Sequence, residues 1–201
     1  LNTNEAPVSG ILLAGGKSAR MGTDKAFLDI GGERLIDRIL KVYKSLFDDI
    51  VIVTNEPLAF LEFSEAAVVT DIYKGKGPLG GIYTGLFYAK NPCAFVSACD
   101  MPFLSAAFIA FLVAQTGRQD IIVPVTENGY QPLCAVYSQK CLPSILRLLL
   151  LDQLKITGFY RDMQVLAVGK NQIAPFNPDG RLFRNLNTPD DLNEIFVSPD
   201  V

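Results

Sequence analysis

The stretch from Gly10 to Gly32, GILLAGGKSARMGTDKAFLDIGG, combines a buried-strand pattern with glycines and basic side chains. Its apolar run ends at Ala14 and is followed at once by Gly15 and Gly16. Adjacent glycines let backbone N–H groups approach a ligand without an intervening Cβ, and amides gathered in a concave turn bind phosphate oxygens. Three cations belong to the same loop: Lys17, Arg20 and Lys25. We therefore expect this loop to bind an anionic ligand.

Two familiar phosphate-binding motifs do not fit this loop. In G-x-G-x-x-G, the second and third glycines would fall on Lys17 and Arg20, and in a P-loop the upstream glycine would fall on Ile11. A plain glycine turn with solvated cations is one alternative. The density of positive charge directly after a strand favours the other, an anion-binding loop of a different kind.

Strand and helix patterns alternate along the chain and indicate where this loop must lie. Strands are expected at residues 8–14, 50–53, 66–69, 94–98, 120–125, 133–137 and 165–168, and helices at 33–47, 79–88, 105–115, 141–151 and from 187. This order predicts an α/β fold, a three-layer Rossmann-like arrangement with a mostly parallel sheet and helices on both faces. Because ligands bind beyond the carboxyl ends of such strands, the loop after Ala14 falls at a binding edge.

Polar side chains follow three further predicted strands. Asn55 follows the second strand, Asp71 the third and Asp100 the fourth. A lone carboxylate at a strand end, preceded by apolar residues, is well placed to hold Mg²⁺. For Asp100, an aspartate that caps a turn or helix before Pro102 is the alternative, and both interpretations fit this segment.

Two more segments contain glycines or asparagines at predicted helix starts. In Gly77-Pro78-Leu79-Gly80-Gly81, the bare backbone would let a ring or a phosphate lie against it, and turn chemistry alone is the alternative. In Asn185-Leu186-Asn187-Thr188-Pro189, either asparagine offers a neutral oxygen ligand. A helix start with Thr188 as cap and Pro189 in the first turn explains much of that segment without a function.

The composition excludes several classes of chemistry. The chain has no histidine, which excludes Ser-His-Asp and Cys-His catalysis and His-ligated zinc, and leaves carboxylates, lysine, backbone amides or a hard metal ion. The net charge of −3 argues against a nucleic-acid partner. No two of the four cysteines form a C-x-x-C pair, which favours reduced, mostly buried thiols. No apolar run reaches the ~20 residues of a membrane span, and residues 1–9 lack an apolar signal core, so we expect a cytoplasmic protein.

These segments together resemble the molybdenum cofactor guanylyltransferases, the family of molybdopterin-guanine dinucleotide biosynthesis protein A. The resemblance is carried by L-A-G-G-K-S-x-R-M-G-x-D-K at 13–25, G-P-L-G-G at 77–81, C-D-M-P at 99–102 and N-T-P-D-D-L at 187–192. The motifs keep the family order over nearly the whole chain. They imply one nucleotidyltransferase domain over 1–201, of the nucleotide-diphospho-sugar transferase type, with a nucleotide-binding half at 8–100 and an acceptor-binding half at 101–201.

The resemblance implies transfer of GMP from GTP to the phosphate of molybdopterin, with or without bound molybdenum, and release of pyrophosphate. The partners would be GTP, molybdopterin and, in transient contact, proteins that insert the cofactor. The nucleophile is a phosphate oxygen that is already anionic at pH 7, so no general base is needed. In-line positioning and neutralisation of the triphosphate are needed instead.

The resemblance also implies a triphosphate site and a metal site. Backbone amides at Gly15 and Gly16 would cradle the triphosphate, and Arg20 and Lys25 would neutralise it, with Lys25 nearest the α-phosphate. Asp100 would hold Mg²⁺, which polarises the phosphorus. The three catalytic residues implied in this way are Lys25, Arg20 and Asp100.

Further residues are implied for the nucleotide and the acceptor. The nucleotide-binding set also includes Leu13, Ala14, Asn55, Asp71, Gly77, Pro78 and Gly80. An acidic side chain in the base pocket would accept hydrogen bonds from guanine N1–H and N2–H₂, a pattern that adenine lacks. The acceptor side would comprise Gln131, Pro132 and Asn187, with Asn187 as a second metal contact.

Several alternatives stay open alongside this implied function. They are a cytidylyltransferase for the same acceptor, a nucleotidyltransferase for another phosphorylated small molecule, and a nucleotide-binding regulatory module without turnover. The combination of Lys25 and Asp100 argues against the module, since a binder would not need both. The loop is one residue shorter than in some family members, and residues 139–183 carry no family motif, so the acceptor is less defined than the nucleotide.

Overall fold

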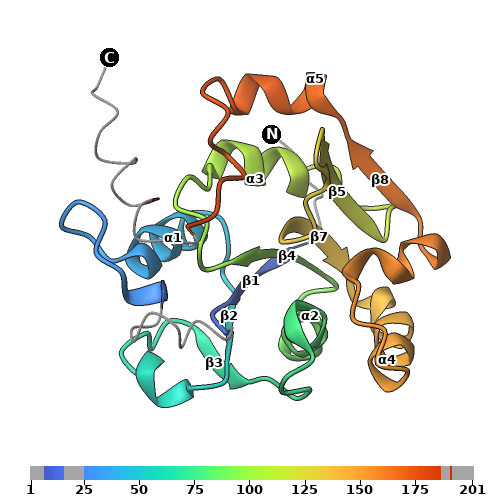
Figure 1. The fold of residues 1–201 in the computed structure, drawn as a ribbon, viewed down its shortest axis with the longest axis horizontal. Helices are drawn as coiled ribbons and strands as arrows, with labels where there is room; N and C mark the ends of the chain where they lie inside the picture. Colours follow the sequence, from blue (N-terminus) through green and yellow to red (C-terminus); the bar gives the residue numbers. More distant parts are fainter. Residues whose placement is uncertain (1–6, 16–24, 187–190, 192–201) are drawn as a thin grey trace.

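The computed structural model describes residues 7–15, 25–186 and 191 of the chain, and its centre is a mixed eight-stranded sheet (Figure 1). The strands are β1 (Val8–Leu13), β2 (Ile50–Thr54), β3 (Ala67–Thr70), β4 (Cys93–Ala98), β5 (Ile121–Thr126), β6 (Gly129–Tyr130), β7 (Cys134–Ser138) and β8 (Val165–Val168). Their order is β3-β2-β1-β4-β7-β5-β6, and β8 pairs with β5. The predicted strands are therefore confirmed, with bounds that shift by at most one residue.

The sheet divides into a parallel part and a mixed part. β1 pairs in parallel with β2 and β4, and β2 pairs in parallel with β3. β7 runs antiparallel between β4 and β5, because the short connection after the β5–β6 hairpin has no room for a parallel crossover. The carboxyl ends of β1, β2, β3, β4 and β5 therefore meet at one edge, as the prediction of a mostly parallel sheet requires.

Helices cover both faces of the sheet. The helices are α1 (Leu35–Lys44), α2 (Gly77–Tyr88), α3 (Ala106–Val113), α4 (Leu142–Leu150) and α5 (Lys170–Ile173), with short 3₁₀ turns that include η2 (Lys25–Phe27), η3 (Pro57–Phe60) and η5 (Ile156–Asp162). Along β1, Leu12 packs with α1 and α3 in one apolar cluster, whereas Ile11 and Leu13 pack with α2 and α4 in the other. The two sets of helices lie on opposite sides of the sheet in Figure 1, so the three-layer prediction is confirmed.

Gly10 shows why a central strand contains a glycine. A Cβ at Gly10 would stand 2.5 Å from Phe47 Cδ2 and 2.6 Å from Tyr43 Cδ1. Both rings are buried, and the Tyr43 hydroxyl donates to the Ile11 carbonyl at 2.9 Å. The glycine lets α1 and the residues after it pack directly on β1.

The predicted helices are confirmed except for the last one. The helix predicted at 33–47 occupies only Leu35–Lys44, because Arg34 is extended and pairs with Asp29 in a turn before the helix, and residues 45–46 form a turn after it. Ser105 caps α3 by accepting from the Phe108 amide at 3.3 Å, so that helix begins one residue later than predicted. The helix predicted from 187 lies outside the described residues. No described helix has the length and apolar character needed to span a bilayer.

Candidate active site

A cleft of about 170 Å³ opens at the shared carboxyl edge of the parallel strands. Seven of the predicted site residues line it: Leu13, Gly15, Lys25, Asn55, Asp71, Pro78 and Asp100. They come from four separate segments, and the parallel pairing of β1 with β2 and β4 brings these segments together. The cleft is smaller than the roughly 300–1,000 Å³ of typical small-molecule sites, so we expect it to enclose part of a ligand rather than all of it.

Asp100 is a partly buried carboxylate with one unsatisfied oxygen. It follows β4 by two residues, and its Oδ1 is buried without a hydrogen-bond partner among the described residues. Burial raises the pKa of Asp100, and the positive charge of Lys25 opposes that shift. A buried carboxylate oxygen that lacks a donor is costly unless a cation or a ligand completes it.

Lys25 reaches the same place from the end of the glycine-rich loop. Its Nζ donates to the Leu186 carbonyl at 3.0 Å, and the Leu186 amide donates to the Asp100 carbonyl at 2.8 Å. Leu186 itself is buried in the apolar core, so it fixes both partners. Lys25 and Asp100 are therefore held side by side by a main chain 161 positions away from Lys25.

Asp71 is buried at the end of β3, where donors already meet one of its oxygens. The Asp71 amide donates to the Thr54 carbonyl at 3.1 Å. Its Oδ1 accepts from the Tyr73 amide at 3.0 Å and from the Thr84 hydroxyl at 2.9 Å. Asn55 lies nearby against Gly15, where an added Cβ would stand 3.5 Å from Asn55 Nδ2.

The start of α2 closes the same side of the cleft. Pro78 and Gly81 line the cleft, whereas Gly77 and Gly80 lie beside it without lining it. Gly77 has a φ of +63°, and a Cβ at Gly81 would stand 3.1 Å from Leu13 Cδ2. Small residues at this turn therefore allow α2 to approach the end of β1 closely.

The residues predicted on the acceptor side lie on the next loop along the edge. Gln131 Nε2 donates to Thr126 Oγ1 at 2.9 Å, and the Tyr137 hydroxyl donates to the Pro132 carbonyl at 2.7 Å. Neither Gln131 nor Pro132 lines the cleft, but the following residue, Leu133, does. The hydroxyl of Tyr160, on η5, hydrogen-bonds to the Tyr137 hydroxyl at 2.7 Å and so holds Tyr137 in place against the Pro132 carbonyl.

The remaining predicted site residues divide into two groups. Ala14 is buried and does not line the cleft; its amide pairs with the Val53 carbonyl at 2.8 Å. Gly16, Arg20 and Asn187 lie outside the described residues, as do Lys17 and Asp24. The interpretation of Asn187 as a metal contact therefore stays a prediction.

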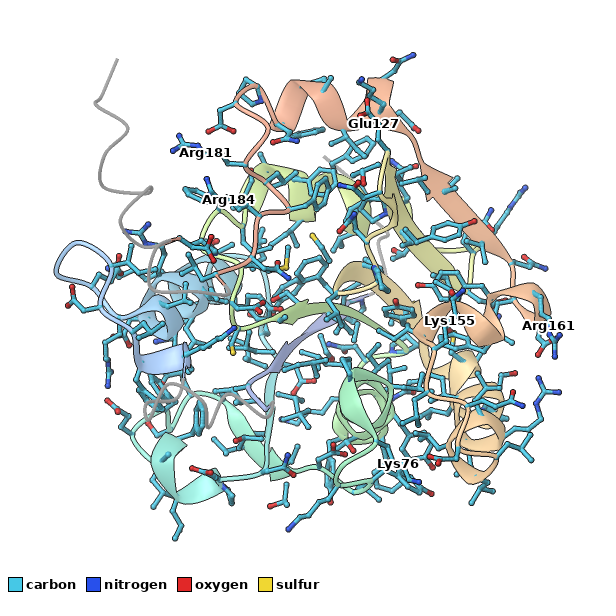
Figure 2. All side chains as sticks on the ribbon, viewed as in Figure 1. Lys76, Glu127, Lys155, Arg161, Arg181 and Arg184 are labelled. Carbon is cyan, nitrogen blue, oxygen red and sulfur yellow. The ribbon has the colours of Figure 1, made fainter. Side chains whose placement is uncertain are left out.

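Sequence reasoning missed two residues that organise the site. Thr84 is a buried hydroxyl on an otherwise apolar helix face, and that pattern was a usable signal because such a group requires a partner. Leu186 acts through its main chain, which leaves no signal in residue type. The unrecognised segment 139–183 supplies Tyr160, whereas its Arg161 lies at the outer edge of the molecule in Figure 2.

A larger hollow of about 560 Å³ lies beside α1, and most of its charged side chains form ion pairs. Arg34 contacts Asp37 at 2.6 Å and Glu62 at 2.8 Å, and its hydrogen bond to Glu62 lowers the pKa of that carboxyl. Arg34 also lies 5.7 Å over the Phe27 ring and so holds η2, which begins with Lys25. We therefore interpret this hollow as support for η2 and the smaller cleft as the candidate active site.

The match to a family model decides how this cleft is classified. The model of the MobA-like NTP transferase domain matches residues 10–165, which include every described cleft residue. The chain belongs to this family. Relatives of the MobA-like family include the molybdenum cofactor guanylyltransferase of Desulfosudis oleivorans, 40% identical over 93% of both chains. The probable molybdenum cofactor guanylyltransferase of Natranaerobius thermophilus is 36% identical over 93% of this chain and 94% of its own.

Solved structures give the MobA-like family its fold. Molybdopterin-guanine dinucleotide biosynthesis protein A from Archaeoglobus fulgidus superposes with a TM-score of 0.79 at 26% identity, covering 94% of this chain and 96% of its own. The 2-C-methyl-D-erythritol 4-phosphate cytidylyltransferase of Thermus thermophilus superposes with a TM-score of 0.70 at 15% identity, covering 94% and 97%. The second likeness concerns the fold alone, which is that of the nucleotide-diphospho-sugar transferases.

Proposed function

We propose that this protein transfers GMP from GTP to the phosphate of molybdopterin, with or without bound molybdenum. The names of its relatives support a guanylyltransferase role in molybdenum cofactor biosynthesis. The observation that carries the proposal is the pairing of Lys25 with Asp100 across the Leu186 main chain, at the mouth of a cleft that also contains Asp71. In this proposal, the side of the cleft with Asn55 and Asp71 holds the nucleoside, and the side with Lys25 and Asp100 holds the phosphates.

Lys25 is the cation that this proposal places on the triphosphate. Its Nζ already engages a carbonyl oxygen at 3.0 Å, so phosphate oxygens can replace that partner without a large movement of the side chain. The amides of Gly15 and Gly16 and the guanidinium of Arg20 complete the triphosphate site in this proposal. Charge that grows on pyrophosphate as it leaves is then met by fixed cations and amides.

Asp100 is the residue that would hold Mg²⁺. Its buried Oδ1, which has no donor among the described residues, fits a hard cation. No cluster of three or more Asp, Glu, Cys or His side chains in the described residues could cage a metal ion, so Asn187, phosphate oxygens and water would supply the other ligands in this proposal. When bound there, Mg²⁺ would neutralise phosphate charge and polarise the α-phosphorus.

For this reaction, the protein has to align the two substrates and neutralise the charge of the triphosphate. An oxygen of the acceptor phosphate forms a bond to the α-phosphorus of GTP, the bond between that phosphorus and the bridging β-oxygen breaks, and pyrophosphate departs. The attacking oxygen is anionic at pH 7, so the absence of histidine from the chain is no obstacle. Lys25 then holds the leaving charge, and Asp71 and Asn55 hold the nucleoside end in this proposal.

The acceptor would bind on the side of Gln131, Pro132 and Asn187. Tyr137 and Tyr160 fix the Pro132 carbonyl, which gives this loop a defined shape. The product would pass to cofactor-insertion proteins in a transient contact. We place the reaction in the cytoplasm, which agrees with the reduced thiols of Cys93, Cys134 and Cys141.

A pyrophosphate-release assay tests the proposal directly. Purified protein, Mg²⁺ and GTP should release pyrophosphate only when molybdopterin is added. A parallel competition of GTP against CTP should favour GTP. No release from folded protein under these conditions rejects the proposed reaction, and a preference for CTP rejects the proposed nucleotide.

A further inference from the structure

The two oxygens of the Asp71 carboxylate have different surroundings. Oδ1 accepts from the Tyr73 amide at 3.0 Å and from the Thr84 hydroxyl at 2.9 Å. A carboxylate oxygen offers two lone pairs, so these two donors fill Oδ1. Among the described residues, every hydrogen bond to this side chain goes to Oδ1. Since Asp71 lines the cleft, Oδ2 is the oxygen that a ligand can use.

The direction of the bond from Thr84 follows from a count of protons. Thr84 Oγ1 accepts from the Ile72 amide at 3.0 Å, and its single proton goes to Asp71, because an ionised carboxylate only accepts. The Thr84 side chain is fully buried on α2. The hydroxyl therefore links the Ile72 backbone to the carboxylate and restrains rotation of the Asp71 side chain.

Gly80 provides an independent observation about Oδ2. A Cβ built at Gly80 would stand 3.3 Å from Asp71 Oδ2 and 2.9 Å from the Tyr73 carbonyl oxygen. The first distance is tight, and the second is shorter than real Cβ contacts allow. A side chain at this position would therefore crowd Oδ2, and the glycine keeps that oxygen uncovered.

We infer that Thr84 is a positioning residue for base selection: it fills and fixes Oδ1, so that Asp71 presents only Oδ2 to the base. This inference rests on the proposed function, which assigns Asp71 to the nucleobase. Guanine offers N1–H to such an oxygen, whereas adenine has an unprotonated N1 at the same place. Selection then depends on one fixed acceptor, and not on a two-oxygen contact with N1–H and N2–H₂.

Matched variants of Thr84 test the inference by direct binding. Thr84→Val keeps the shape and removes the hydroxyl, and Thr84→Ser keeps the hydroxyl. With Mg²⁺ present and no acceptor, calorimetry should show the preference for GTP over ATP reduced about tenfold in Thr84→Val, the range expected for a hydrogen bond to a charged group. Thr84→Ser should stay within about threefold of the original protein. A folded Thr84→Val protein with an unchanged preference overturns the inference.

A second measurement needs no variant and applies if Thr84→Val does not fold. Inosine triphosphate retains N1–H and lacks only the 2-amino group, so a single fixed oxygen on N1–H predicts that it binds nearly as well as GTP and clearly better than ATP. Inosine triphosphate as weak as ATP, or equal binding of GTP and ATP, overturns the inference. Neither measurement uses the acceptor, so a failed pyrophosphate assay with this binding order intact rejects the proposed reaction alone.

Discussion

Asp71 follows β3 and Asp100 follows β4, with β2 and β1 between them; both aspartates line one cleft, but their surroundings differ. Asp71 is buried, and the Tyr73 amide and the Thr84 hydroxyl occupy its Oδ1. Asp100 is partly buried, and no donor among the described residues reaches its Oδ1. Burial raises the pKa of Asp100 despite the nearby Lys25.

The difference indicates two uses of the same functional group. A carboxylate whose protein donors are already in place is held in one orientation, which suits recognition of a rigid base. A carboxylate with one buried oxygen that no donor reaches gains most from a cation that arrives with the substrate. Variants at the two positions should therefore affect different kinetic constants.

Asp100→Ala should have the largest effect on turnover. Loss of a metal contact worth several kcal/mol lowers kcat by about 10³-fold or more, while the fold stays intact. The rate of pyrophosphate release measures the loss, and circular dichroism checks the fold. If a folded Asp100→Ala protein keeps near-original activity, Asp100 has no metal role and the contrast with Asp71 disappears.

Lys25→Ala should have the next largest effect. Removing one charge-stabilising group costs on the order of 10²–10³ in kcat. Lys170→Ala is a matched control, because Lys170 is an exposed cation paired with Glu127 and does not line the cleft. A change below about threefold for Lys25→Ala would remove Lys25 from the mechanism.

Asp71→Asn should change binding of GTP and leave the chemical step almost unaltered. The amide oxygen of the asparagine can still accept from Tyr73 and Thr84, but an NH₂ group then replaces Oδ2 and cannot accept from guanine N1–H. KM for GTP should therefore rise roughly 10–100-fold, as for loss of a hydrogen bond to a charged group. Steady-state kinetics with saturating acceptor separates KM from kcat. A loss confined to kcat would contradict the assignment of Asp71 to recognition.

Asp100→Asn should make the metal-free protein slightly more stable at neutral pH. Because the folded-state pKa of Asp100 is raised, its contribution to stability is full below the unfolded pKa and is lost as pH rises through the folded pKa. Removing one desolvated charge should raise the free energy of unfolding by on the order of 1 kcal/mol, which raises Tm by roughly 2–4 °C for a chain of this size.

Thermal melts in EDTA at two pH values measure this small effect. The gain of Asp100→Asn should be present near neutrality and disappear below the ordinary aspartate pKa of about 4, where Asp100 itself is protonated. A destabilised variant at neutral pH would mean that attraction to Lys25 outweighs desolvation. In that case Asp100 would already be satisfied without a cation.

Much of the fold could be predicted from local pattern. The apolar run at 50–53 predicts a buried strand, and the spacing of apolar residues over 142–150 predicts a helix with one buried face. The antiparallel placement of β7 between β4 and β5 was not predicted, because strand order depends on pairings between distant segments. The strand-end positions of Asn55, Asp71 and Asp100 were predicted, since the carboxyl edge follows from the alternation of elements.

The sequence by itself determined the alternation of strands and helices, the glycine-rich loop after β1 and the positions of two aspartates at one edge of the sheet. Only the tertiary structure decided which hydrogen-bond partners and charges surround each aspartate. Thr84 reaches Asp71 from 13 positions away, and the Leu186 main chain joins Lys25 to Asp100 from the far end of the described chain. Such contacts depend on how packed elements close in space, and neither residue type nor spacing encodes that geometry.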